Sequence, residues 1–110
     1  MEREYEAQIA NATCEGVKIA LNNHLASIEK YKNIENSFTT ETTYHMDKML
    51  VHARIVRVEE HLGNINTKNE HINSAQQECK MLLWDDCSEQ KILWFSKESE
   101  KNHPISCLND

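Results

Sequence analysis

The residue types that could hold a metal ion are present, but they lack the spacing that such a site needs. His45 and His52 are seven residues apart, which on a helix is roughly 10 Å and too far for both to bind one ion. Glu41 and His45 lie at i and i+4, an arrangement that many solvated pairs share. His103 and Cys107 have no second pair of ligands nearby in the sequence. We therefore expect no metal site and no cofactor.

The four cysteines, Cys14, Cys79, Cys87 and Cys107, include no C-x-x-C pair. Cys14 and Cys79 fall on apolar stripes, where a free cysteine behaves as a small hydrophobic residue. The first six residues include three glutamates and one arginine, whereas a signal peptide begins with a basic stretch followed by an apolar one. These observations predict reduced thiols and a cytoplasmic protein, and a nuclear location fits them equally well.

Enzyme signatures are missing from the chain. It has no Gly-rich phosphate loop, no G-x-S-x-G, no H-E-x-x-H and no kinase motif, so we expect a protein that is not an enzyme. The net charge is −6, with acidic and basic residues interspersed, which argues against direct binding to nucleic acid. The longest apolar run, Ile92 to Phe95, is far too short to span a membrane.

The elements that position these residues are predicted to be helices. Gly16 and Gly63 are the only glycines and Pro104 is the only proline in 110 residues. A sheet with many tight turns draws heavily on both residue types. The composition therefore predicts an all-α protein built from a few long helices, in a coiled coil, a helical hairpin or a bundle.

The clearest pattern is a heptad seam in the middle of the chain, with alternating steps of three and four residues. Its a positions are Ile55, Leu62, Asn69, Gln76 and Leu83, and its d positions are Val51, Val58, Ile65, Ile72 and Cys79. Gly63 falls at an outward b position. Because the phase is unbroken across it, we expect one continuous helix over residues 41–83. In the alternative, Gly63 and Asn64 end one helix and begin another.

Such a seam requires a partner helix, in this chain or in another one. Asn69 at an a position favours a two-stranded coil, whereas Ile65 and Ile72 at d favour higher oligomers. The flanking e and g positions carry few charges, although complementary charges there are what a homodimer would use. This favours a hetero-oligomer of helical chains over a homo-oligomer.

A weaker apolar stripe runs from Ala7 to Phe38 and does not join the seam in register. The phase changes within a segment rich in Thr, a residue that disfavours helix interiors. We predict a helix over about 2–36, a break at about 37–41 and a slight preference for a hairpin over one continuous rod.

The C-terminal region contains the apolar run Ile92, Leu93, Trp94 and Phe95, within a predicted short helix at about 88–97. If the chain doubles back, this helix approaches Trp84. The run is a candidate docking segment for a partner protein, because Trp is enriched in binding hot spots. The alternative is that it covers the local core. Residues 1–97 are predicted to form a single domain, followed by a flexible tail at 98–110.

These features predict a structural or adaptor subunit of a multi-protein helical assembly, acting through coiled-coil contacts. The alternative is a small acidic helical inhibitor or regulator, for example a viral one, that binds another macromolecule.

Overall fold

The computed structural model describes residues 13–34 and 41–109, and the regular structure in this part of the chain is helical. Its elements are α2 (Cys14–Ile34), α3 (Glu41–Leu62), α4 (Ile65–Met81), α5 (Glu89–Asn102) and the short 3₁₀ helix η1 (Ser106–Asn109). No strand occurs among the described residues, so the all-α prediction is confirmed. None of the described helices has the length and hydropathy that would let it cross a membrane.

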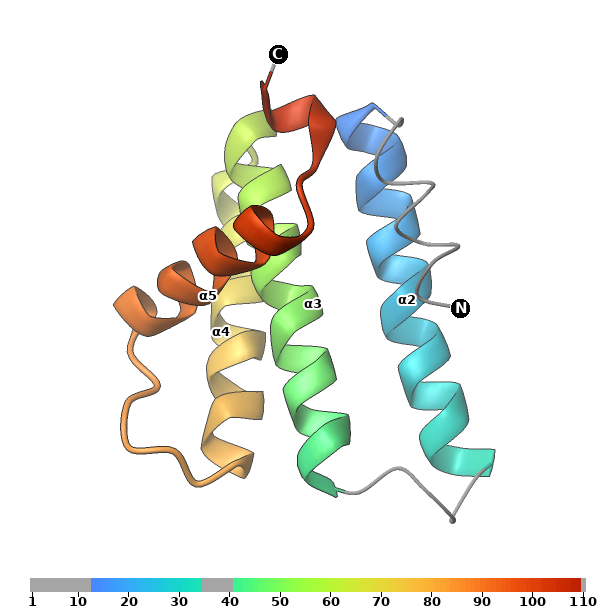
Figure 1. Ribbon diagram of the computed structural model, residues 1–110, viewed down its shortest axis with the longest axis vertical. Helices are drawn as coiled ribbons and strands as arrows, with labels where there is room; N and C mark the ends of the chain where they lie inside the picture. The colour runs from blue at the N-terminus through green and yellow to red at the C-terminus, as the bar shows by residue number, and fades with distance from the viewer. Residues whose placement is uncertain (1–12, 35–40, 110) are drawn as a thin grey trace.

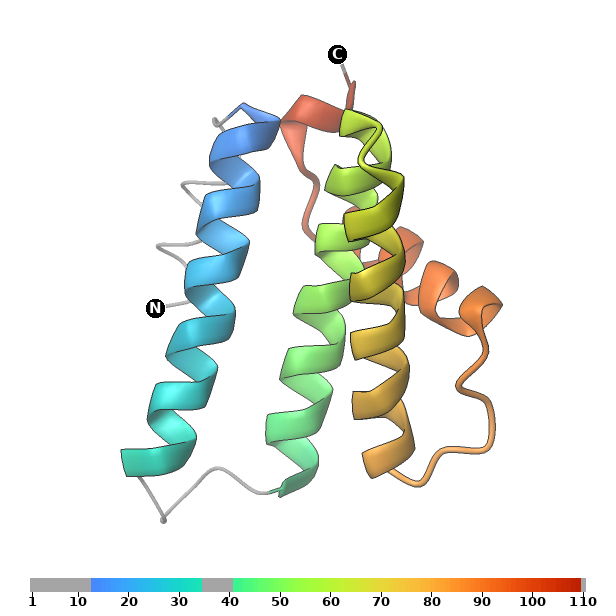
Figure 2. The same ribbon diagram turned by 180° about the vertical axis from the view of Figure 1, so that it is seen from behind.

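Helix α3 lies at the centre and packs against each of the other three α-helices. Figures 1 and 2 show α2, α3 and α4 running alternately down, up and down, while α5 crosses beside α3 and α4 at a steep angle. The last segment, η1, returns to the N-terminal end of α2. The hairpin of α2 and α3 agrees with the predicted change of direction. Of the break expected at about 37–41, residues 37–40 lie outside the described residues and Glu41 begins α3, and the ends of the helix predicted over 2–36 also lie outside them.

The chain reverses at Gly63, so the prediction of one helix over 41–83 is wrong. Gly63 has a φ of 80°. Its N–H donates to the carbonyl of Glu60, and the N–H of Asn64 donates to the carbonyl of Glu59. This pair of bonds is a Schellman motif, which ends helices at a residue in the left-handed conformation. The heptad spacing therefore spans two helices, and its first members in α4, Ile65 and Asn69, are exposed.

Apolar residues gather in two clusters that both include α3. The first joins α2, α3 and the C-terminal segment: Cys14, Val17, Ala20, Leu21, Val51, Ile55, Val58, Ile105 and Cys107. The second joins α3, α4 and α5: Met49, Ala53, Ala75, Cys79 and Ile92. A helix that is covered on more than one side carries apolar residues beyond a single stripe. This is why Met49 and Ala53 are buried although they lie off the predicted seam.

The predicted flexible tail at 98–110 is ordered through residue 109, so that prediction is also wrong. Helix α5 continues to Asn102, and the side chain of Ile105 is only 1% exposed. The N–H of Ile105 donates to the carboxylate of Glu100, and a guanidinium N–H of Arg54 donates to the carbonyl of His103. The chain after α5 therefore stays packed against the domain, because Ile105, the residue that follows Pro104, is buried in the first cluster.

Replacing Gly63 with alanine distinguishes the turn from a continuous helix by the sign of the stability change. An added Cβ at Gly63 meets no atom within 4 Å, so its cost is conformational. At positive φ we expect the Gly63→Ala variant to lose about 1–2 kcal/mol in unfolding free energy. In a continuous helix it would gain up to about 1 kcal/mol. Denaturant unfolding measures the difference. Gly16→Ala, within α2, is the control and is expected to be neutral or stabilising.

Candidate interaction surface

All four cysteines are paired, which corrects the expectation that they are free thiols. Cys14 bonds to Cys107 and Cys79 bonds to Cys87, and no free cysteine remains. Cys14 and Cys79 are buried as predicted, since both lie inside apolar clusters. The even number of cysteines was the only sign of pairing in the sequence. Their spacing could not show it, because Cys14 and Cys107 meet only when η1 folds back onto α2.

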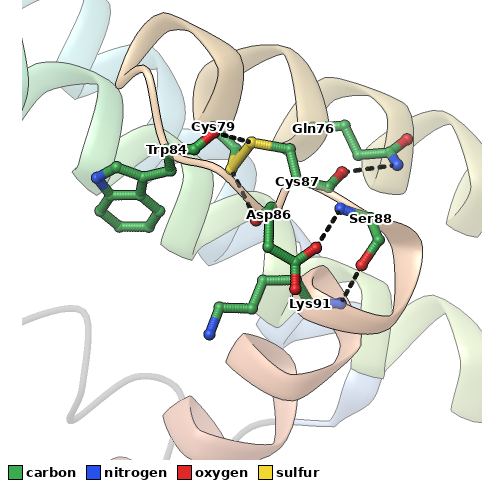
Figure 3. The surroundings of a disulfide bond; sticks show 7 residues. All are labelled: Gln76, Cys79, Trp84, Asp86, Cys87, Ser88 and Lys91. Atoms are coloured by element: carbon green, nitrogen blue, oxygen red, sulfur yellow. Dashed lines mark hydrogen bonds between the residues drawn. A yellow bond between two sulfur atoms is a disulfide. The ribbon is translucent and has the colours of Figure 1, made fainter.

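The Cys79–Cys87 disulfide closes a loop between α4 and α5 (Figure 3). Inside the ring, the N–H groups of Leu82 and Leu83 donate to carbonyls in the last turn of α4. The side-chain amide of Gln76 donates to the carbonyl of Cys87. Ser88 then caps α5 by accepting a hydrogen bond from the N–H of Lys91. The loop is thus fixed to both helices by covalent and hydrogen bonds.

Leu83 is the most unusual residue of this loop. Its φ is 61°, in the left-handed region, and its side chain is 89% exposed. It is the one described residue other than glycine with positive φ. A side chain in this conformation costs roughly 1–2 kcal/mol. The cost is not offset by burial of the leucine within its own chain.

Leu83 is followed in the chain by Trp84, whose ring lies beside aromatic rings of α5. The ring centroids of Trp84 and Phe95 are 5.7 Å apart, and those of Phe95 and Trp94 are 5.1 Å apart. The ammonium of Lys91 lies 4.4 Å from the centre of the Trp94 ring. Trp84 and Trp94 keep 36% and 49% of their surface exposed. We call Leu83, Trp84, Lys91, Trp94 and Phe95 the aromatic surface.

The predicted docking run at 92–95 divides between core and surface. Ile92 is fully buried in the second apolar cluster, and Phe95 packs partly against that cluster. Leu93 is half-buried, and only Trp94 is exposed. The approach of α5 to Trp84, expected if the chain doubled back, is present in the ring contact with Phe95. Leu83 was missed as a surface residue because the heptad pattern assigned it to the seam.

Most of the seam packs inside the chain itself. The buried members are Val51, Ile55, Val58, Ile72 and Cys79, the half-buried ones are Leu62 and Gln76, and the exposed ones are Ile65, Asn69 and Leu83. The seam residues of α3 cluster with α2 and the C-terminal segment, whereas Cys79 of α4 clusters with Met49 and Ala53, which lie off the seam. Asn69, expected to specify register inside a coil, instead faces solvent.

A polar cluster links α2, α3 and α4. The Lys48 ammonium contacts Glu29 at 2.6 Å and Glu78 at 3.3 Å, and the Nδ1 of His45 lies 3.1 Å from Glu78. Burial alone would lower the pKa of Lys48, but its hydrogen bonds to Glu29 and Tyr44 raise it above the usual value. Each charge here meets an opposite one, so the cluster ties three helices together. His45 also contacts Glu41, the pair noted in the sequence.

A second polar contact joins two histidines across α3 and α4. The Nδ1 atoms of His52 and His71 are 2.9 Å apart, so the N–H of one ring donates a hydrogen bond to the unprotonated nitrogen of the other. Burial is the main reason that the pKa of His52 is lowered to about 4, and the neighbouring His71 lowers it further. Burial also lowers the pKa of His71. Within the described residues, no group of three or more His, Cys, Asp or Glu side chains is arranged to hold a metal ion.

Comparison with known proteins returns no match: no family model, curated protein or solved structure is significantly similar to this chain.

The two disulfides are expected to differ in their contribution to stability. They join residues separated by 93 and by 8 positions. The loss of chain entropy in the unfolded state then stabilises by about 4–5 kcal/mol for Cys14–Cys107 and about 2–3 kcal/mol for Cys79–Cys87. Denaturant unfolding of two variants, each with both cysteines of one disulfide replaced by alanine, measures which disulfide contributes more to the free energy of unfolding. Equal losses would contradict the entropic account.

Acidification is expected to destabilise the fold through the histidine pair. The folded pKa of His52 is depressed, so between about pH 6.5 and pH 4 the unfolded chain binds more protons. Stability therefore falls as the pH falls through this window, by on the order of 2 kcal/mol once partial exposure is allowed for. Lys48 and Lys18 reinforce the effect, while Glu78, Glu59 and Glu70 oppose it.

Thermal melts from pH 7.5 to pH 4 test this pH dependence. The His52→Gln/His71→Gln double variant should show a shallower pH dependence, because neither amide titrates. His61→Gln, at an exposed position, is the matched control and should follow the parent chain. Identical slopes for all three proteins would assign the acid sensitivity to other groups.

Proposed function

We propose that this chain is a non-enzymatic protein-binding subunit or adaptor that contacts another protein chain through the aromatic surface. The observation that carries the proposal is Leu83, an exposed leucine in a left-handed conformation on a disulfide-closed loop. Such strain is retained where a loop presents a side chain for a purpose other than its own packing. Two partly exposed tryptophans beside it are the residue type most enriched in binding hot spots.

The rigidity of the loop supports a binding role. Association usually costs free energy because loops and side chains lose conformational freedom, and a loop held before binding reduces that cost. Here the disulfide, the Gln76 amide and the Ser88 cap hold Leu83 and Trp84 in place. Among the residues whose burial the structure describes, four of the six large exposed apolar side chains lie from Met81 to Trp94. Exposed apolar side chains that cluster in this way mark interaction sites.

We place the contact of the proposed helical assembly on a different face from the coiled-coil seam. Val51, Ile55, Val58 and Ile72 are covered by the chain's own helices, which leaves little of the seam for a partner. The proposal of a helical assembly remains, but its contact lies at the α4–α5 loop.

A small acidic regulator that binds another macromolecule is the second candidate. It is favoured by the two disulfides, which stabilise a small domain without help from a larger complex. Structural disulfides persist in oxidising compartments. We therefore propose that the chain acts in such a compartment, in place of the cytoplasmic location expected from its sequence.

Substitution of Leu83 tests the proposed function. A tagged, disulfide-bonded chain is used to recover binding proteins from the cells that produce it, beside Leu83→Asp and Ile19→Asp variants. Ile19 is a matched control because it is 62% exposed on α2, away from the loop. We expect Leu83→Asp to reduce recovery of a specific partner roughly tenfold or more. Ile19→Asp should leave recovery unchanged, and equal recovery with all three proteins would remove the aromatic surface as the contact.

A further inference from the structure

Charges of both signs border the aromatic surface. Asp86 follows Trp84 in the disulfide loop by two residues, and its Oδ1 accepts a hydrogen bond from the N–H of Ser88. Lys91 lies close enough to Asp86 for their charges to interact, and its ammonium lies over the rings of Trp94 and Phe95. Figure 3 shows the Asp86 carboxylate between the disulfide and the Lys91 side chain. One acid and one base thus flank a single apolar area.

This arrangement suits contact between two identical surfaces. In a two-fold dimer, residue i of one copy meets residue j of the other, and j meets i in return. A surface with charges of one sign would repel its copy, whereas Asp86 and Lys91 form two opposite-charge pairs across such an axis. Exposed Leu83 and the two tryptophans supply the apolar centre that dimer interfaces require.

The sequence argument for a hetero-oligomer does not apply to this surface. That argument rested on the scarcity of charges beside the heptad seam, and the seam packs largely within the chain. Beside the aromatic surface, exposed Asp85, Asp86 and Glu89 lie in the sequence between Lys80 and Lys91. The acidic residues would also face the headgroups of an anionic membrane unfavourably.

We propose that the aromatic surface joins two copies of this chain in a two-fold dimer, with Leu83 of each copy packed against the tryptophans of the other. The inference rests on the proposed function, because it names the partner of the same surface. Asp86 of each copy pairs with Lys91 of its partner. Reduction of the Cys79–Cys87 bond weakens the dimer, because the free loop no longer holds Leu83 in its left-handed conformation.

Sedimentation velocity and tryptophan fluorescence of the purified, oxidised chain test the dimer directly. Trp84 and Trp94 are the chain's only tryptophans, so the emission reports on this surface alone. We expect a concentration-dependent dimer mass together with a blue shift of the emission. Leu83→Asp should raise the dimer dissociation constant at least roughly tenfold. Ile19→Asp should leave it unchanged, and circular dichroism checks that both variants remain folded.

A charge exchange tests the two-fold arrangement. Asp86→Lys and Lys91→Glu each place like charges opposite one another, so each variant alone should dimerise more weakly than the parent chain. An equimolar mixture of the two restores both opposite-charge pairs and should form a heterodimer of near-parental affinity. Raising the salt concentration should weaken the parental dimer. If the mixture is no stronger than either variant alone, these residues do not face each other and the proposed dimer is overturned.

Three further outcomes would also overturn the dimer. A monomer at every accessible concentration is one, and a dimer that Ile19→Asp disrupts while Leu83→Asp does not is another. The third is a monomer that binds zwitterionic phosphatidylcholine vesicles through Leu83. If a monomeric chain recovers a different protein in a Leu83-dependent way, the proposed function stands and only the second copy is excluded.

Discussion

The whole structure depends on the burial of α3 along two faces at once. One face is covered by α2 and the C-terminal segment, and the other by α4 and α5. A chain of 110 residues buries a smaller share of its surface than a larger protein does, so its stability depends on covering its apolar side chains well. A single central helix with neighbours on both sides lets short helices share one interior. Helix α3 is the α-helix that contributes residues to both apolar clusters, and it therefore connects them.

Polar contacts then select one arrangement of the helices around α3. The Lys18 ammonium reaches the fully buried carboxylate of Glu59 at 3.4 Å, which fixes α2 against the end of α3. The amide of Asn64 donates to the same carboxylate from the turn that follows. In the second cluster, the Ser96 hydroxyl donates to the carbonyl of Ala53 and holds α5 on α3. A displaced helix would leave these buried groups without partners, which is costly in a nonpolar interior.

The sequence was sufficient for the helical class, for the start of α3 near residue 41 and for the burial of half of the seam positions. It was not sufficient for the direction of the chain after Leu62. The heptad spacing was unbroken across Gly63, so it gave no sign that the chain reverses there. The Cys14–Cys107 pair was also hidden, because its two residues are 93 positions apart in the sequence. Leu83 continued the apolar period and was therefore assigned to the interior, where the structure does not place it.

The Cys14–Cys107 bond has a mechanical consequence. It joins the first turn of α2 to η1, so nearly every described residue lies within one covalent ring. Tension applied to chain segments outside this ring passes through the sulfur–sulfur bond and bypasses the four helices. The helical core would stay folded under loads that unravel an unlinked helical protein of this size. Only after reduction of that bond would the same pull reach α2 and separate it from α3.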